Sequence, residues 1–248
     1  MLANFDINHL LAFPVKDRDA VNKSLVGFVV TLLAFVIPIL PMLILAGYTA
    51  RIARQVLDGQ KPSMPAWDDW GTMIKDGARI FAVRMIYASP LLLILIVVFG
   101  LMAFLPVFAE TSGDPDSTGI FIFFPLLVFG SMIVTVPFSF FLGIVLPAAE
   151  VHVIAQNEFA AGFRFREWWA VFRKNWGGFL LAFALSYAIS ILLVMGTQLL
   201  MITIILACLV PLLMPAVAFY MSVVMYAAFA RAYKDGREMP LQEPTRQD

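Results

Sequence analysis

Cysteine and histidine are nearly missing from this sequence. Cys208 is the single cysteine among 248 residues, so the chain can form neither a disulfide within itself nor a thiolate cluster around a metal. There are two histidines, and the nearer acid to His152 is Glu150, two positions away and therefore on a diverging face of a helix. No glycine-rich phosphate loop appears either. We therefore expect no metal, no other cofactor and no catalytic residue.

Charged residues are also scarce, at 14% of the chain against 61% hydrophobic residues, which is more apolar side chain than one soluble core buries. Four stretches contain no Asp, Glu, Lys, Arg or His: 24–50, 85–109, 117–149 and 175–230. A helix needs about 20 apolar residues to cross hydrocarbon, and the last stretch is long enough for two helices. The pattern predicts an all-α integral membrane protein whose first partner is the lipid bilayer.

An excess of positive charge is missing too, because 17 basic residues are balanced by 17 acidic ones. Nucleic-acid binding needs clustered excess Lys and Arg, so we expect no nucleic-acid partner. The amino-terminal segment has no basic start and no uninterrupted apolar core, so we expect no cleaved signal peptide. A membrane protein partner or a second copy of the chain stays open.

The basic residues that are present lie unevenly. Six fall in residues 51–84, four in 150–174 and four from Arg231 onward, whereas 109–119 has none and carries three acids. By the positive-inside rule, 109–119 is external and the three basic segments are cytoplasmic. This predicts a multi-pass protein of the cell (inner) membrane with its carboxyl terminus in the cytoplasm.

The first apolar stretch allows two arrangements. A single crossing gives five transmembrane helices in all but leaves Lys16, Arg18 and Lys23 outside, against the positive-inside rule. Pro38 and Pro41 could instead break the stretch into a re-entrant hairpin, which makes six membrane helices. We favour five crossings.

The two halves of the chain resemble each other at a separation of about one hundred residues, as expected for an internal duplication. The matched pairs are Pro38 with Pro137, Arg51 with Glu150, Asp58 with Asn157, Trp67 with Trp168, Gly77 with Gly177 and Tyr87 with Tyr187. Each half would be a span, an interfacial helix and a second span, related as a parallel repeat. Chance similarity between apolar segments is the alternative. The resulting division is an amino-terminal segment 1–24, a first membrane repeat 25–108, a second membrane repeat 119–203, a last span 204–234 and a cytoplasmic tail 235–248.

A polar segment within each repeat shows helical amphipathicity, over 65–77 and over 163–176. In the first, Trp67 and Trp70 share an arc opposite Asp68 and Asp69. We expect both segments to be helices lying flat in the cytoplasmic interface, with Trp67, Trp70, Trp168 and Trp176 at headgroup depth. Binding of a partner or of lipid headgroups by the same faces is the alternative.

Arg51 and Glu150 take equivalent places in the two repeats, each directly after an uncharged stretch. A parallel duplication would let these opposite charges meet at the cytoplasmic end of the helices, which lowers the cost of a charge near lipid. Alternatively, Arg51 reaches a headgroup phosphate and Glu150 faces water.

Two short elements carry a family resemblance. Gly47, Tyr48 and Arg51 in "GYTAR" and residues 65–70, "PAWDDW", resemble the Gly-Tyr-x-x-Arg and Pro-x-x-Asp-Asp-Trp elements of a widespread prokaryotic multi-pass membrane family catalogued as a domain of unknown function. The resemblance is best over residues 13–87. It implies a membrane-embedded helical fold and lends no catalytic residue.

These features favour a non-catalytic membrane protein, namely a scaffold, an assembly subunit or a lipid-organising component. The alternative is a transporter or channel-like protein for a small solute or lipid, which would use proline-broken helices and the charges of Arg51 and Glu150. We favour the first reading because the charges lie at the ends of the spans rather than deep within them.

Overall fold

The computed structural model describes residues 7–112, 118–202 and 208–239, and this part of the chain contains helices and no β-strand. It forms two compact units, one of residues 1–83 with 147–248 and the other of residues 84–146. The all-α class predicted from the sequence is confirmed.

Four helices of the described residues are long and apolar enough to cross a membrane. They are α4 (Trp70–Ser112), α5 (Thr118–Gln156), α7 (Trp176–Met201) and α9 (Val210–Glu238). Along the second unit, α4 and α5 leave large apolar side chains such as Ile96, Phe99 and Ile133 exposed. Such faces suit lipid rather than water, and the chain is a membrane protein as expected.

The first uncharged stretch is not among these four helices, because it is broken at Pro38. Helix α2 (Arg18–Leu33) ends before this proline and α3 (Ile39–Leu57) begins directly after it. Proline has no backbone N–H and its ring clashes with the preceding turn, so a helix cannot continue through it unchanged. Pro41 lies in the first turn of α3, where a missing donor costs little.

One contact joins the start of α2 to the segment that follows α3. Lys23 donates a hydrogen bond from Nζ to the carbonyl oxygen of Met64 at 3.1 Å. Five single crossings would hold these two residues on opposite sides of about 30 Å of hydrocarbon. The contact favours the hairpin broken at Pro38 over a single crossing, and the number of crossings stays a prediction.

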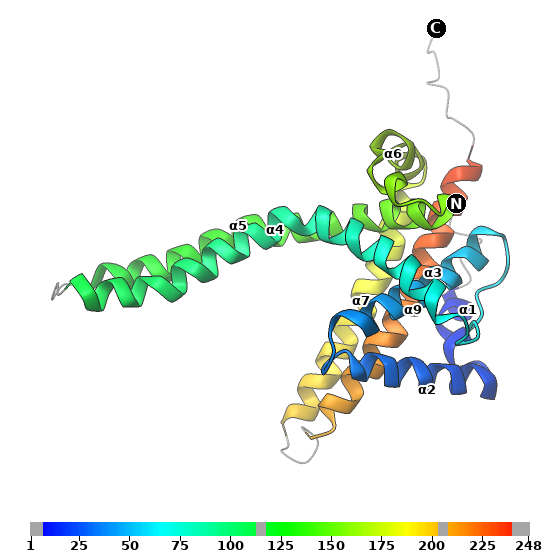
Figure 1. Cartoon of the computed structure of the whole chain (residues 1–248), viewed down its shortest axis with the longest axis horizontal. Coiled ribbons are helices and arrows are strands. Elements are labelled where there is room, and N and C mark those ends of the chain that lie inside the picture. Colours follow the sequence, from blue (N-terminus) through cyan, green and yellow to red (C-terminus); the bar gives the residue numbers. More distant parts are fainter. Residues whose placement is uncertain (1–6, 113–117, 203–207, 240–248) are drawn as a thin grey trace, which may run out of the picture. The chain divides into compact units, whose positions relative to one another are not determined.

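Helix α9 is the centre of the first unit. It packs against α2, α3, α7, the short helix α6 (Phe165–Lys174) and the amino-terminal helix α1 (Ile7–Ala12), as the orange and red ribbon in Figure 1 shows. Phe229 and Tyr233 of α9 are almost fully buried. Two 3-10 turns complete the unit, η1 (Phe13–Val15) and η2 (Phe159–Phe163).

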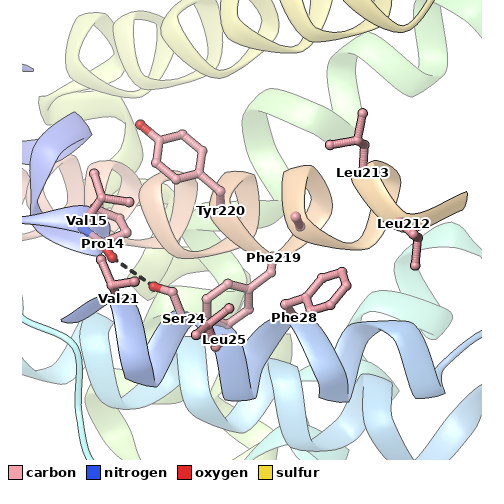
Figure 2. Close-up of a pocket in the computed structure, with 11 residues that line it drawn as sticks. Pro14, Val15, Val21, Ser24, Leu25, Phe28, Leu212, Leu213, Phe219 and Tyr220 are labelled. Carbon is pink, nitrogen blue, oxygen red and sulfur yellow. Dashed lines mark hydrogen bonds between the residues drawn. The ribbon is translucent and has the colours of Figure 1, made fainter. Parts of the chain in front are cut away.

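An apolar groove lies between α9 and the amino-terminal elements η1 and α2 (Figure 2). At the same contact, a side chain on Gly27 of α2 would come within 2.1 Å of the ring of Phe219. Only glycine lets this ring pack so closely on α2.

The polar segment 65–77, expected to be a separate interfacial helix, is only partly helical. Residues 60–69 are not helical, α4 begins at Trp70, and the helix continues through residue 77 without a break. Asp69 has a φ of 47°, in the left-handed region, which is incompatible with a regular α-helix at this residue. In the second half, α6 lies within the expected range 163–176 as a separate helix that ends at Lys174. That either segment lies flat in the interface stays a prediction.

The halves also differ where the repeat predicts likeness. Pro38 separates two helices, whereas its counterpart Pro137 lies inside the continuous helix α5. Helices α3 and α5 nevertheless end at Leu57 and Gln156, at matching places in the alignment. The parallel repeat stays a prediction. Of the segments assigned from sequence, residues 1–6, 113–117 and 240–248 of the amino-terminal segment, external stretch and tail lie outside the described residues, as do residues 203–207 around the start of the last span.

Candidate functional site

The two elements that carry the family resemblance bind each other in the structure. Tyr48 of α3 is fully buried, and its ring stacks on that of Trp67 with centroids 3.9 Å apart and planes 9° from parallel. Its hydroxyl donates to the carbonyl oxygen of Pro65 at 3.0 Å, and the indole of Trp67 donates to the carbonyl oxygen of Lys23 at 2.8 Å. Stacking and hydrogen bonds thus hold the polar segment against both helices of the hairpin.

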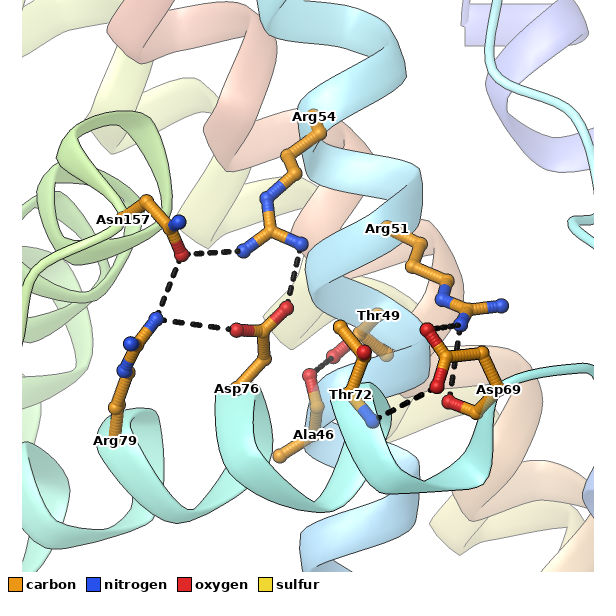
Figure 3. Close-up of polar contacts among 9 residues, drawn as sticks. All are labelled: Ala46, Thr49, Arg51, Arg54, Asp69, Thr72, Asp76, Arg79 and Asn157. Atoms are coloured by element: carbon orange, nitrogen blue, oxygen red, sulfur yellow. Dashed lines mark hydrogen bonds and ion pairs between the residues drawn. The ribbon is translucent and has the colours of Figure 1, made fainter.

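Arg51 completes this contact. One guanidinium nitrogen donates to the Asp68 carboxylate at 2.5 Å and to the carbonyl oxygen of Ala66 at 3.2 Å. The other donates to the carbonyl oxygen of Asp69 at 3.2 Å and lies 3.9 Å from the Asp69 carboxylate (Figure 3). The forked donor geometry of arginine lets one side chain fix a whole turn of backbone.

Asp69 also starts helix α4. Its carboxylate accepts a hydrogen bond from the backbone N–H of Thr72 at 3.3 Å, in the manner of a helix cap. Hydrogen bonds from the side chain and backbone of Thr72 hold the pKa of Asp69 below its usual value, and Arg51 acts in the same direction. Asp69 is therefore ionised at neutral pH.

A second network joins α3, α4 and the end of α5. Arg54 donates to the Asp76 carboxylate at 2.5 Å, and Arg79 approaches the other oxygen of the same carboxylate at 3.3 Å. Both arginines donate to the side-chain oxygen of Asn157, at 3.4 and 2.6 Å, which closes the ring seen in Figure 3. Asp76 is 5% exposed, so two guanidinium groups compensate one buried carboxylate.

Glu150 and His152 are buried in the last turns of α5, each with a tyrosine of α9. Tyr226 donates to the Glu150 carboxylate at 2.5 Å, and His152 Nδ1 is hydrogen-bonded to the Tyr233 hydroxyl at 2.5 Å. The other ring nitrogen of His152 lies 3.2 Å from the Glu167 carboxylate, which is half exposed. Two ionisable groups buried in a candidate span thus reach their partners on a single face of α9, since residues seven apart share a face.

Arg51 and Glu150, which the repeat predicts as a pair, do not pair in the structure. Arg51 binds the polar segment 66–69, and Glu150 binds Tyr226. Equivalent positions in a repeat do not have to touch, and a loop that begins a few residues after Arg51 offers carboxylates at lower entropic cost.

Trp168 is the other predicted site residue that changes its role. It is fully buried in protein, and its indole donates to the carbonyl oxygen of Gly162 at 3.1 Å. The rings that do remain exposed are those of Trp70 and Trp176, at 42% and 63%. Trp168 therefore does not face headgroups directly, because the protein covers it.

Sequence reasoning selected Tyr48, Arg51, Asp68 and Asp69, which the structure brings together, and missed several polar partners. The missed residues are Arg54, Asp76, Arg79, Glu167, Tyr226 and Tyr233. The two tyrosines carried a usable signal, because they are seven apart in an apolar helix and so lie on one face.

The arrangement ties helices together through ion pairs and hydrogen bonds. Among the described residues, no three His, Cys, Asp or Glu side chains converge as a metal would require. Asp68, Asp69 and Asp76 each form an ion pair with an arginine.

Comparison with known proteins places these networks in a family. No curated protein and no solved structure matches the chain. A family profile with the description "Protein of unknown function (DUF4013)" matches residues 30–202, which include both elements joined by Tyr48 and Arg51 as well as Glu150 and Trp168. Because the match covers more than half of its length, the chain belongs to this family of proteins of unknown function, DUF4013.

Proposed function

We propose that the protein is a non-catalytic, cofactor-free component of the cell (inner) membrane that acts as a scaffold, an assembly subunit or an organiser of lipids. The observation that carries this proposal is the use of its polar side chains. Arg51, Arg54 and Arg79 all bind carboxylates of the same chain and lock the hairpin to α4 and α5. Its large exposed surfaces are apolar, as a membrane-embedded frame requires.

The proposed orientation keeps the polar ends of these helices in the cytoplasm. Asn157 at the end of α5 meets Arg54 at the end of α3, and Asn175 before α7 donates to the carbonyl oxygen of Ala232 in α9. Four alternating spans bring these ends to one side. The contact of Lys23 with Met64 adds the amino-terminal basic residues to that side, which satisfies the positive-inside rule throughout.

Transport of a small solute is the second candidate, favoured by one observation. Glu150 and His152 are 2% and 3% exposed within a candidate span, where ionisable groups are costly and usually mark a pathway. Their hydrogen bonds to Tyr226 and Tyr233 also fit a purely structural role.

Purification of the full chain in mild detergent, followed by identification of bound proteins, lipids and solutes, tests both candidates. A protein partner at stoichiometric amount supports the scaffold or assembly role. A retained polar solute that Glu150→Gln releases supports transport instead. Glu158→Gln is the matched control, because Glu158 is exposed and its partner Arg164 lies six residues away. Neither partner nor retained ligand in repeated preparations from native membranes would contradict the proposal.

A further inference from the structure

The apolar groove between the amino-terminal elements and α9 has the size and chemistry of a ligand site. It encloses about 390 Å³, within the ~300–1,000 Å³ common for small-molecule sites. Figure 2 shows Phe219 of α9 directed toward Leu25 and Phe28 of α2. Pro14 and Val15 of η1 close one end.

Only two side chains of the lining carry a polar group, and both groups are already bonded. Ser24 donates its hydroxyl to the carbonyl oxygen of Pro14 at 2.8 Å, and Tyr220 donates its hydroxyl to that of Leu11 at 2.8 Å. A polar ligand would lose its own hydrogen bonds to water without replacement. The groove therefore suits a hydrocarbon chain.

Positive charge stands beside this groove. Lys16 directly follows Val15 of the lining, and Arg18 begins α2; both are exposed. Asp17 and Asp19, the acids next to these cations, already have other partners. Asp17 accepts a hydrogen bond from the backbone N–H of Ala20 at 2.8 Å, and Asp19 forms an ion pair with Lys23 at 2.6 Å. Among the described residues, no carboxylate lies within ion-pair distance of Lys16 or Arg18. An anionic group fits beside an apolar cleft here.

We propose that this groove binds one acyl chain of an anionic glycerophospholipid, with its phosphate held by Lys16 and Arg18. The inference deepens the lipid-organising part of the proposed function and rests on it. Lipid tails are as apolar as the groove, so burial alone does not select a ligand inside a bilayer. Selection comes from the fit of the chain and from the two cations, because a basic side chain near anionic lipid is attracted to it.

The test uses the full-length protein in vesicles of phosphatidylcholine containing a small share of phosphatidylglycerol that carries a photoactivatable group midway along one acyl chain. After illumination and proteolysis, mass spectrometry locates the labelled residues. We expect labelling to concentrate in residues 21–28 and 212–220 and to fall when unlabelled phosphatidylglycerol is added. This competition requires no variant and so does not depend on mutant folding.

Two variants in neighbouring positions make the test specific. Ala216→Phe fills the groove, whereas Ala218→Phe places the same ring two residues further along α9, outside the lining. We expect groove labelling to be lost in the first and kept in the second, with both proteins eluting as a single species. Replacing Lys16 and Arg18 by alanine should reduce the preference for phosphatidylglycerol over phosphatidylcholine about thirtyfold at low salt.

Labelling spread evenly over the exposed helices, or unchanged by Ala216→Phe, would overturn the groove assignment. An unaltered lipid preference in the Lys16 and Arg18 variant would overturn the headgroup assignment. Neither result bears on whether a protein partner copurifies, so a failure here is distinct from a failure of the scaffold or assembly role.

Discussion

Helices α3 and α4 cross at two glycines, and this crossing supports the most quantitative prediction. A Cβ atom on Gly47 would lie 1.9 Å from the carbonyl oxygen of Met73, and one on Gly77 would lie 1.8 Å from that of Leu43. Both obstructing atoms belong to backbone, which cannot rotate aside as a side chain does. We predict that Gly47→Ala destabilises the protein.

The size of the effect follows from the geometry. To reach an ordinary contact of 3.4 Å from 1.9 Å, the helices must separate by 1.5 Å at this point. Overpacking of this kind costs about 2 kcal/mol. The shift also loosens the hydrogen bonds of the neighbouring Tyr48 and Arg51, at about 1 kcal/mol each. The better helix propensity of alanine returns about 1 kcal/mol, which leaves a loss of about 3 kcal/mol.

The assay is thermal unfolding in detergent, followed by fluorescence-detected size exclusion. A loss of this size should lower Tm by about 6–12 °C for a chain of this length. Gly100→Ala is the matched control, since a Cβ there meets no atom within 4 Å, and its Tm should be unchanged or slightly higher. If Gly47→Ala melts within about 2 °C of the control, the close crossing of α3 and α4 is refuted.

Two further predictions concern the polar segment and the hairpin. Arg51→Ala and Asp68→Asn should show a coupling of about 0.5–1 kcal/mol in a double-mutant cycle, limited by the exposure of Asp68, whereas Arg51→Ala and Glu150→Gln should be additive; stronger coupling to Glu150 would contradict the observed pairing. Single cysteines at Asn22 and Ser63, in a chain without the native cysteine, should react with an impermeant thiol reagent from the same side of the membrane, and labelling from opposite sides would disprove the hairpin.

The class of fold could be predicted because it depends on composition alone. Uncharged stretches of more than 20 residues have few alternatives to membrane helices. They located α5, α7 and α9 and the apolar part of α4. What they could not locate is a helix boundary inside polar sequence, because there hydropathy gives no contrast.

The helix expected over 65–77 shows why boundaries fail. The periodicity of Trp67, Trp70 and the aspartates satisfies a helical pattern, yet residues 60–69 are not helical. The ring of Tyr48 stacks on that of Trp67, and Arg51 donates hydrogen bonds to backbone carbonyl oxygens of this segment. A tertiary contact thereby overrides a local pattern, and local patterns carry no information about such a partner.

The candidate site was half predictable for a related reason. Tyr48, Arg51 and Asp68 stand out as polar or aromatic residues next to apolar stretches. The sequence does not show which of these residues pair. The repeat suggested that Arg51 pairs with Glu150, whereas in the structure Arg51 pairs with Asp68 of the loop. Residues such as Tyr226 are hidden among apolar neighbours, and only the fold shows that a buried carboxylate lies opposite.

The break in the first apolar stretch is built in a way that suits hydrocarbon. Each backbone N–H of residues 34–37 donates to a carbonyl oxygen of the last turn of α2, so the turn leaves none of these donors unsatisfied. Pro38 and Pro41 have no N–H, which removes two of the donors that the start of α3 would otherwise expose. The side chains here are apolar and exposed, with Val36 at 78%. Interrupted helix is tolerated in lipid only where its backbone is satisfied. The two prolines therefore do more than end a helix, because they make a hairpin tip that can enter the bilayer and return to the side on which Lys23 meets Met64.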